Sequence, residues 1–158
     1  MATTTASISI TSDILSSGTS ISTSMTMTKA GTNNGLDRTT GVQRVYLTDT
    51  KHIDLAKGGL ANTNLADMTL SASAKVYIKY LEDDTSKFIR VGLGNEADGT
   101  TATANNGDGT HFEIGRLYGN EWMIIPWNGA SNVGDITVQP SVATSADKAI
   151  VEYIVFFE

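Results

Sequence analysis

The strongest constraint on the fold is the spacing of the apolar residues, which follows the two-residue repeat of β-strands along much of the chain. Ile8 and Ile10 alternate with serine and threonine, and the same alternation returns from residue 21 to residue 28. A period of two is typical of strands that bury one face. No segment of about ten residues or more shows the helical period. The sequence therefore predicts an all-β protein.

Further runs of β-branched and aromatic residues lie at 42–50, 75–81, 87–93, 111–118, 121–127, 135–139 and 149–157, with a shorter strand or edge expected within 51–59. Residues 60–70 fit neither period. About eight to ten short, evenly spaced strands favour a mainly antiparallel β-sandwich with a jelly-roll-like arrangement over a parallel α/β fold. We expect a single sandwich domain over residues 21–158, preceded by residues 1–20 as an extended arm or a first strand.

Three polar segments predict turns between these strands. Residues 82–86 separate two apolar runs, which is the pattern of a hairpin with a loop of about five residues. Gly119 and Asn120 form a two-residue turn between the next two runs, and this pair favours positive φ angles. Residues 31–40 form a loop, in which Asn34 and Gly35 favour positive φ in the same way.

The composition excludes several classes of partner. The chain has no cysteine, which rules out disulfides and fits a reducing cytosol. Its 11 basic side chains are scattered among 17 acidic ones, for a net charge of −6. Nucleic-acid binding needs clustered lysine and arginine, so we expect no nucleic-acid partner. The N-terminus does not resemble a secretory signal, and no apolar stretch reaches the length of about 20 residues that a membrane span requires.

The sequence also lacks the patterns of an active site or a metal site. His52 and His111 stand alone, without an acidic or histidine partner at ligand spacing. No serine lies in a GxSxG turn, and the glycines of 92–99 do not form a phosphate-binding loop. The acidic groups at 82–84 and in 95–110 (Glu96, Asp98, Asp108) lack the spacing of a calcium loop. We therefore expect a protein that is not an enzyme and has no cofactor, no metal and no catalytic residue.

Both tryptophans lie in the run 121–127, five residues apart in the numbering and on opposite faces of a regular strand. They cannot form one stacking platform. We expect one of them in the core, and Trp127 as a cap over the sandwich or as a subunit contact. Pro126 cannot donate a hydrogen bond to a neighbouring strand, which places this end at a sheet edge or at the start of a loop.

The C-terminal run 149–157 is apolar on both faces, with Ile154 and Phe156 on the face that also carries Glu152. Such a strand lies centrally between layers or meets another subunit with one face. The N-terminal run has high β-propensity and almost no charge, so it can add to a neighbour's sheet edge. We expect these two segments to be the assembly elements. The candidate interface residues are Ile8, Ile10, Trp127, Ile154 and Phe156.

The segments KVYIKYLEDDTSKFIRVGLG (75–94), EWMIIPWNG (121–129), DITVQ (135–139) and VEYIVFFE (151–158) occur in this order. In these segments the chain resembles a class of small all-β virion proteins from the structural modules of tailed bacteriophages. That class has strands of the type xVYIKN, VxVGL, xxxxIPW, I-x-V and VEYxxF. The resemblance covers residues 75–158. The chain departs from the pattern in a long insertion between VGLG and HFEIGRLY.

The resemblance implies a capsid decoration (cement) protein, which binds the outer surface of the major capsid protein shell and stabilises it. Proteins of this kind are commonly β-sandwiches that assemble as homotrimers. The implied location is the virion surface, with assembly in the host cytoplasm. Two alternatives are a carbohydrate- or receptor-binding β-sandwich module, and a tail or head-completion structural protein. The resemblance transfers no functional residue.

Overall fold

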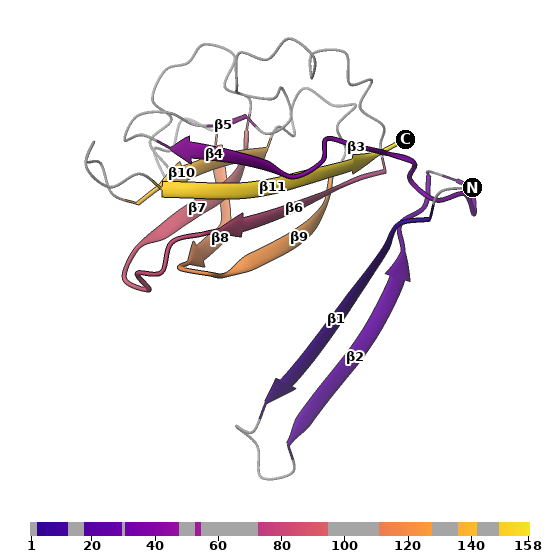
Figure 1. Ribbon diagram of the computed structural model, residues 1–158, viewed down its shortest axis with the longest axis horizontal. Coiled ribbons are helices and arrows are strands. Elements are labelled where there is room, and N and C mark those ends of the chain that lie inside the picture. Colours follow the sequence, from indigo (N-terminus) through magenta and orange to yellow (C-terminus); the bar gives the residue numbers. More distant parts are fainter. Residues whose placement is uncertain are drawn as a thin grey trace.

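The computed structural model describes residues 3–12, 18–29, 31–47, 53–54, 73–94, 111–127, 136–141 and 149–158. All the regular structure in these ranges consists of strands, β1 to β11, and all strand pairs are antiparallel. The strands form two sheets that pack together as a sandwich, and one hairpin that stands away from them (Figure 1). The predicted all-β, antiparallel sandwich is confirmed. The jelly-roll variant stays a prediction.

The larger sheet is built around the C-terminal strand β11 (Ala149–Phe157). One edge of β11 pairs with β6 (Ala74–Tyr80), which in turn pairs with β9 (Trp122–Trp127). The other edge pairs with β3 (Arg38–Thr39) and β4 (Gln43–Leu47). The C-terminal strand is thus the central strand of its sheet, but only one of its faces is buried, because Ile150, Glu152, Ile154 and Phe156 stay partly exposed. The interpretation as a strand covered by layers on both faces is therefore wrong, and a contact of its outer face with another subunit stays a prediction. Strand β9 lies at the edge of this sheet, in agreement with the expectation from its proline.

The smaller sheet has the order β5–β10–β7–β8. Its strands are β5 (Ile53–Asp54), β10 (Ile136–Pro140), β7 (Phe88–Gly94) and β8 (His111–Tyr118). The register between β7 and β8 shifts at Val91 and Gly92, which is the mark of a β-bulge. Strand β5 confirms the short edge strand expected within 51–59. Residues 60–70 and 95–110, as well as His52, lie outside the described residues.

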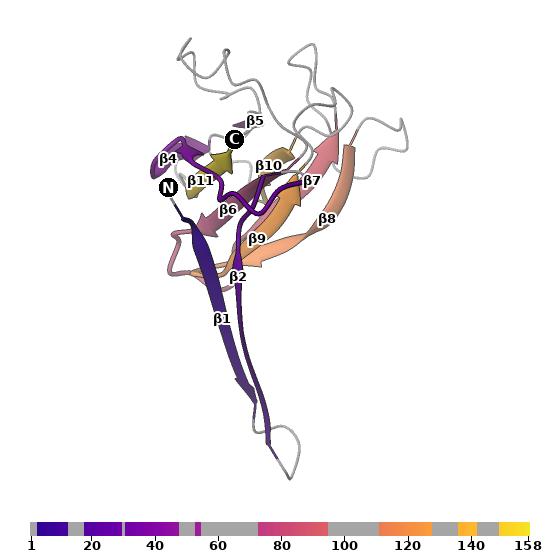
Figure 2. The same cartoon turned by 90° about the vertical axis from the view of Figure 1, so that its right-hand side faces the viewer.

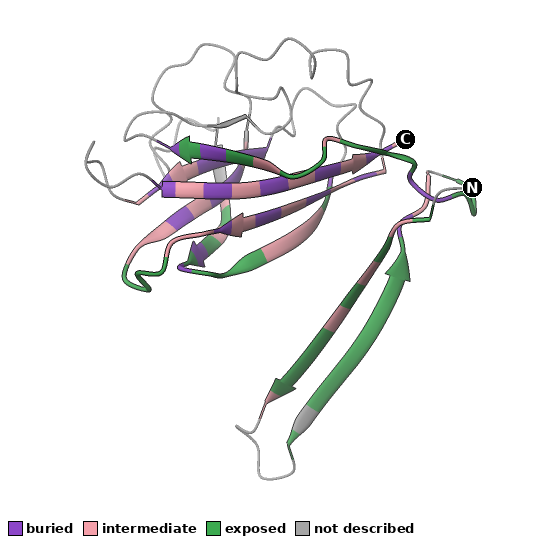
Figure 3. Ribbon diagram, viewed as in Figure 1, coloured by how far each residue is buried: buried purple, intermediate pink, exposed green. Residues whose placement is uncertain are grey.

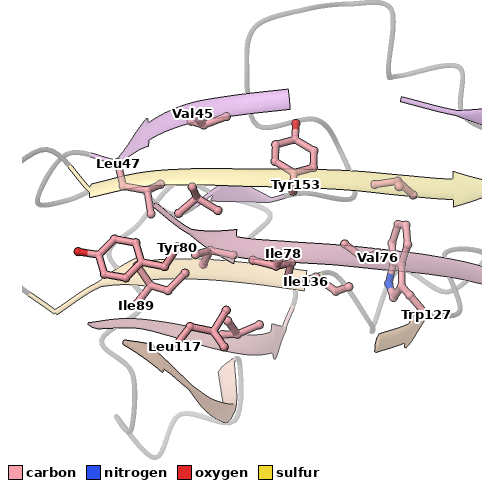
Figure 4. Packing of buried hydrophobic residues seen from close by; sticks show 14 of the residues in the cluster. Val45, Leu47, Val76, Ile78, Tyr80, Ile89, Leu117, Trp127, Ile136 and Tyr153 are labelled. Carbon is pink, nitrogen blue, oxygen red and sulfur yellow. The ribbon is translucent and has the colours of Figure 1, made fainter. Parts of the chain in front are cut away.

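The core lies between the two sheets and follows from strict alternation along the strands. Every second residue of β6 and of β11 is buried, and the residues between them are partly exposed (Figure 3). The buried side chains of both sheets meet in one apolar cluster (Figure 4). The larger sheet contributes Val76, Ile78, Tyr80, Val151, Tyr153 and Val155, and the smaller one Ile89, Val91, Leu117, Ile136 and Val138.

The two predicted hairpins at 75–93 and 111–127 are wrong. Strand β6 belongs to the larger sheet and β7 to the smaller one, and the turn at 81–87 crosses from one sheet to the other. The turn at Gly119 and Asn120 likewise joins β8 to β9 in the opposite sheet. Alternation shows which face of a strand is buried but does not show which strand lies beside it. A short polar turn can cross the roughly 10 Å between packed sheets as well as close a hairpin.

The turn at 118–121 has the predicted positive φ at Asn120 but not at Gly119. Asn120 has a φ of 66°, and the amide of Glu121 donates to the carbonyl oxygen of Tyr118 over 2.9 Å. In the loop 31–40 the prediction was wrong in detail. Positive φ occurs at Gly31 (68°), whereas Asn34 and Gly35 have none. Gly35 instead forms a bridge with Thr28, which fixes it in an extended conformation.

Strands β1 (Thr5–Ser12) and β2 (Thr19–Thr26) pair only with each other. They form a long hairpin that projects from one end of the sandwich and extends well beyond it (Figures 1 and 2). We call residues 5–26 the arm. The sequence predicted that an arm or first strand ends at residue 20. In the structure the arm ends at Thr26, because β2 pairs with β1 and not with the sandwich.

Candidate functional site

The arm has two chemically different faces. The register pairs Ala6 with Met25, Ile8 with Thr23 and Ile10 with Ile21, so these side chains share one, mainly apolar, face. The opposite face carries only hydroxyl groups, and all of them are exposed: Thr5, Ser7, Ser9, Thr11, Ser20, Ser22, Ser24 and Thr26. The single ionisable residue between Met1 and Thr28 is Asp13. The arm is therefore an almost uncharged ribbon with one apolar side.

The apolar face of the arm is largely uncovered. Ile10 is 53% exposed, Ile21 51% and Met25 45%. A two-stranded hairpin on its own is at best marginally stable in water, because it has no second layer to bury its apolar side. Three large apolar side chains on one open ribbon form the kind of surface that soluble proteins keep for contacts with other molecules.

The root of the arm is held firmly. Met27 and Leu36 are buried, and the amide of Leu36 donates to the carbonyl oxygen of Met27 over 2.8 Å. The amide of Met27 donates to the carbonyl oxygen of Thr4 over 2.9 Å, which closes the base of the hairpin. Beside it, Lys29 and Asp37 form an ion pair of 2.9 Å, and the hydrogen bond from Lys29 lowers the pKa of Asp37. These contacts set the direction in which the arm leaves the sandwich.

Between the root of the arm and the outer face of the larger sheet lies a groove of about 500 Å³. The arm contributes residues 4–8 to its lining, together with Met27. The sheet contributes side chains from β6, β9 and β11: Tyr77, Lys79, Trp122, Ile124, Glu152, Ile154 and Phe156. We call this hollow the groove. Its walls come from segments that are far apart in the sequence, and most of its sheet side is apolar.

An aromatic pair and an ion pair mark the sheet side of the groove. The rings of Tyr77 and Trp122 lie 6.2 Å apart with an interplanar angle of 37°, within the range of favourable aromatic contacts. Glu152 accepts a bond of 2.9 Å from the Nε of Arg44 on β4. Burial, and secondarily the charge of Glu152, raises the pKa of Tyr77, which keeps its phenol neutral. The acidic group of the groove is therefore already paired within the sheet.

The outer face of the smaller sheet is arranged differently. The Nε of Arg116 lies 2.8 Å from the Glu113 carboxylate, and that of Arg90 lies 3.5 Å from it. Both guanidinium groups also lie over the ring of Phe88, at 4.6 Å for Arg116 and 5.5 Å for Arg90. One carboxylate thus holds two guanidinium groups against the sheet, and this cluster keeps an excess of positive charge. The groove, by contrast, leaves apolar surface uncovered.

Four of the five predicted interface residues fall on the arm or in the groove. Ile8, Ile154 and Phe156 line the groove, and Ile10 continues the apolar face of the arm beyond it. Trp127 does not belong to this set. It is 4% exposed and packs at one end of the core (Figure 4), so of its two predicted roles the structure supports the cap over the sandwich.

Sequence reasoning missed Trp122, which is 49% exposed and lines the groove. The two tryptophans do lie on opposite faces of β9, as predicted. The sequence interpretation placed Trp127 at the strand end and the other tryptophan in the core, and this assignment is wrong: Trp127 is buried and Trp122 is exposed. A signal was present in the neighbouring residues. Trp122 shares its face with Lys79 of β6 in the register, and a lysine marks the solvent side of a strand.

The described residues contain no group of three histidine, aspartate or glutamate side chains that could hold a metal ion. The imidazole of His111, and the predicted loop residues Glu96, Asp98 and Asp108, lie outside the described part. No helix in the described ranges is long and apolar enough to cross a membrane. Comparisons with protein family models, curated proteins and solved structures gave no match.

Proposed function

We propose that this chain is a non-enzymatic structural protein of a virus particle, of the capsid decoration (cement) type. The observation that carries the proposal is the arm, an almost uncharged hairpin that stands off a closed sandwich with its apolar face largely uncovered. In this proposal the protein performs no reaction and needs no cofactor. Its partners are the major capsid protein and further copies of itself, as a homotrimer, and it binds neither nucleic acid nor membrane. It lies on the virion surface after assembly in the host cytoplasm.

A cement protein must hold neighbouring shell subunits together, and the geometry suits this task. The sandwich is a rigid body, and the arm reaches well beyond it (Figure 2). Strands of eight residues span about 26 Å at roughly 3.3 Å per residue, enough to cross a subunit boundary. Several such contacts on one particle act together, so individually weak contacts add up to firm attachment.

The proposal is tested by removing the arm without disturbing its root. The amide of Met27 already donates to the carbonyl oxygen of Thr4, so an Asn-Gly turn can join these residues and replace 5–26. Purified full-length and arm-deleted chains are added to shells prepared from the virus that carries the gene, and bound copies are counted by electron cryomicroscopy. We expect occupancy to fall at least tenfold on deletion. Unchanged occupancy, or binding to the tail or neck alone, would contradict the decoration role.

A second candidate function rests on the Tyr77 and Trp122 pair. Aromatic rings next to Lys79 and Glu152 in an open groove are also a surface on which a sugar ring can stack. A carbohydrate-binding module would bind a glycan array, and Trp122→Ala would abolish that binding. Trp127→Ala provides no such test, because its indole is in the core.

A further inference from the structure

We propose that the groove receives the arm of a second copy of this chain, so that each copy donates one arm and accepts one, in a pair or in a closed ring. The site on the sheet consists of Tyr77, Trp122, Ile124, Ile154 and Phe156. The docking segment is residues 9–12 and 19–22, the described outer half of the arm. This inference concerns contacts between copies only. It can hold or fail independently of any binding to a viral shell.

The arm and the groove match in chemistry. The outer half of the arm offers Ile10 and Ile21, which are directly opposite in the register on the apolar face, and it carries no charge among its described residues. The sheet side of the groove offers isoleucine and aromatic side chains, and its carboxylate, Glu152, is already held by Arg44. The ammonium group of Lys79, which also lines the groove, can reach water at the rim on its long aliphatic stem, so an apolar ribbon fits this surface without burying an unpaired charge. A charged partner would lack a counterpart on the arm.

The shape of the chain prevents the arm from covering this surface by itself. The root of the arm, residues 4–8, forms one wall of the groove. The outer half extends past the sandwich (Figure 2), where Ile10 and Ile21 are both more than half exposed. One molecule therefore carries both the outer arm and the groove, but its own arm does not enter its own groove. Surfaces that complement each other in this way are typical of an interface between identical subunits.

The contact area favours an exchange over a one-way contact. The outer half of the arm consists of about four residues from each eight-residue strand, a face of about 13 Å by 10 Å, so one outer half in one groove buries about 250 Å² on both sides together. A specific interface requires at least about 1,000 Å². Two copies that exchange arms form two such contacts, about 500 Å² in all, and the exchange brings the two sandwiches together so that contact between them supplies the remaining area. In a ring such as the trimer proposed above, closure makes the contacts act together.

A charge exchange tests this arrangement on the purified chain. Ile21→Lys places a cation on the arm, and Ile124→Glu places an anion in the groove. Each single variant should raise the dissociation constant for self-association at least tenfold in sedimentation equilibrium, because an unpaired charge enters an apolar contact. The double variant should recover most of this loss, because lysine then meets glutamate between copies. Ile114→Lys is the matched control, since Ile114 is 48% exposed on the other sheet, and it should leave self-association unchanged.

Disulfide crosslinking tests whether the arm of one copy lies in the groove of another. The chain has no cysteine of its own that could interfere. Chains with Ile21→Cys and chains with Ile124→Cys are mixed and oxidised. We expect a mixed disulfide dimer as the main product. If Ile21→Cys chains crosslink mainly to each other, the arms pack against one another and the proposal is wrong. If one chain with both cysteines closes within itself at the mass of a single chain, the proposal is also wrong. Glycan binding by a chain that stays monomeric would assign the groove to a sugar instead.

Discussion

Trp122 and Trp127 occupy opposite faces of β9 and form a matched pair for testing the fold. Trp127 is 4% exposed within the core, whereas Trp122 is 49% exposed on the outer face. Burying a tryptophan removes about 200 Å² from water, which at about 25 cal/mol per Å² stabilises the fold by about 5 kcal/mol. Residual burial in the unfolded chain reduces this to about 3–4 kcal/mol.

Trp127→Ala should therefore lower the free energy of unfolding by about 3–5 kcal/mol, because a cavity remains among the core side chains. Trp122→Ala removes about half the area and leaves no cavity, so we expect a loss of about 1.5 kcal/mol. The difference of about 2 kcal/mol or more is measurable by urea unfolding followed by far-ultraviolet circular dichroism. The measurement is best made in the arm-deleted chain, in which association through the arm does not contribute. Removal of residues 5–8 also opens the groove beside Trp122, which lowers the loss expected for Trp122→Ala further. Equal losses, or a larger loss for Trp122→Ala, would refute the assignment of the two faces.

Two further predictions concern the sandwich. In Gly119→Ala the new Cβ would lie 2.6 Å from the carbonyl oxygen of Glu82, so we expect the free energy of unfolding to fall by about 1–3 kcal/mol in thermal unfolding. Asn120→Gly keeps the positive φ and should change the free energy of unfolding by less than about 1 kcal/mol. A larger loss of stability in Asn120→Gly than in Gly119→Ala would contradict the steric role of Gly119. The hydroxyl of Tyr153 is buried without a partner among the described residues, so Tyr153→Phe should be neutral or stabilising by up to about 1 kcal/mol. Burial raises the pKa of Tyr153, so the folded chain retains this proton longer than the unfolded one, and stability should fall as the pH rises above about 10. Unfolding curves of the unchanged chain and of Tyr153→Phe, measured at the same pH values, should show a smaller decrease in stability with pH for the variant. The same decrease in both chains would refute the role of Tyr153.

The positions of the strands were largely predictable from the sequence because burial on one face imposes the period of two. The run 149–157 coincides with β11, and the assignment of Tyr153 and Phe156 to opposite faces is correct. The run 111–118 likewise coincides with β8. In both cases the pattern reports local geometry, which depends only on residues within the same strand.

The pairing of the strands could not be predicted in the same way. The alternation in 75–81 and 87–93 is the same whether the two strands lie side by side in one sheet or face each other across the core. The arm shows the same limit. Ile8 and Ile21 were expected in strands, but only their registers show that they share a face. The exposed position of Trp122 depends on which face of the larger sheet is covered by the smaller one, which is a property of the whole sandwich.

The most direct test of the account is amide hydrogen exchange in the arm, residues 5–12 and 19–26, measured over a range of protein concentrations. A hairpin without a neighbour is marginal and exchanges quickly, whereas one that is docked on another copy is protected. We predict slow exchange in the arm at high concentration and fast exchange on dilution, with β6 and β11 unchanged throughout. Exchange in the arm that is independent of concentration, whether fast or slow, would contradict the claim that its exposed apolar face exists for assembly.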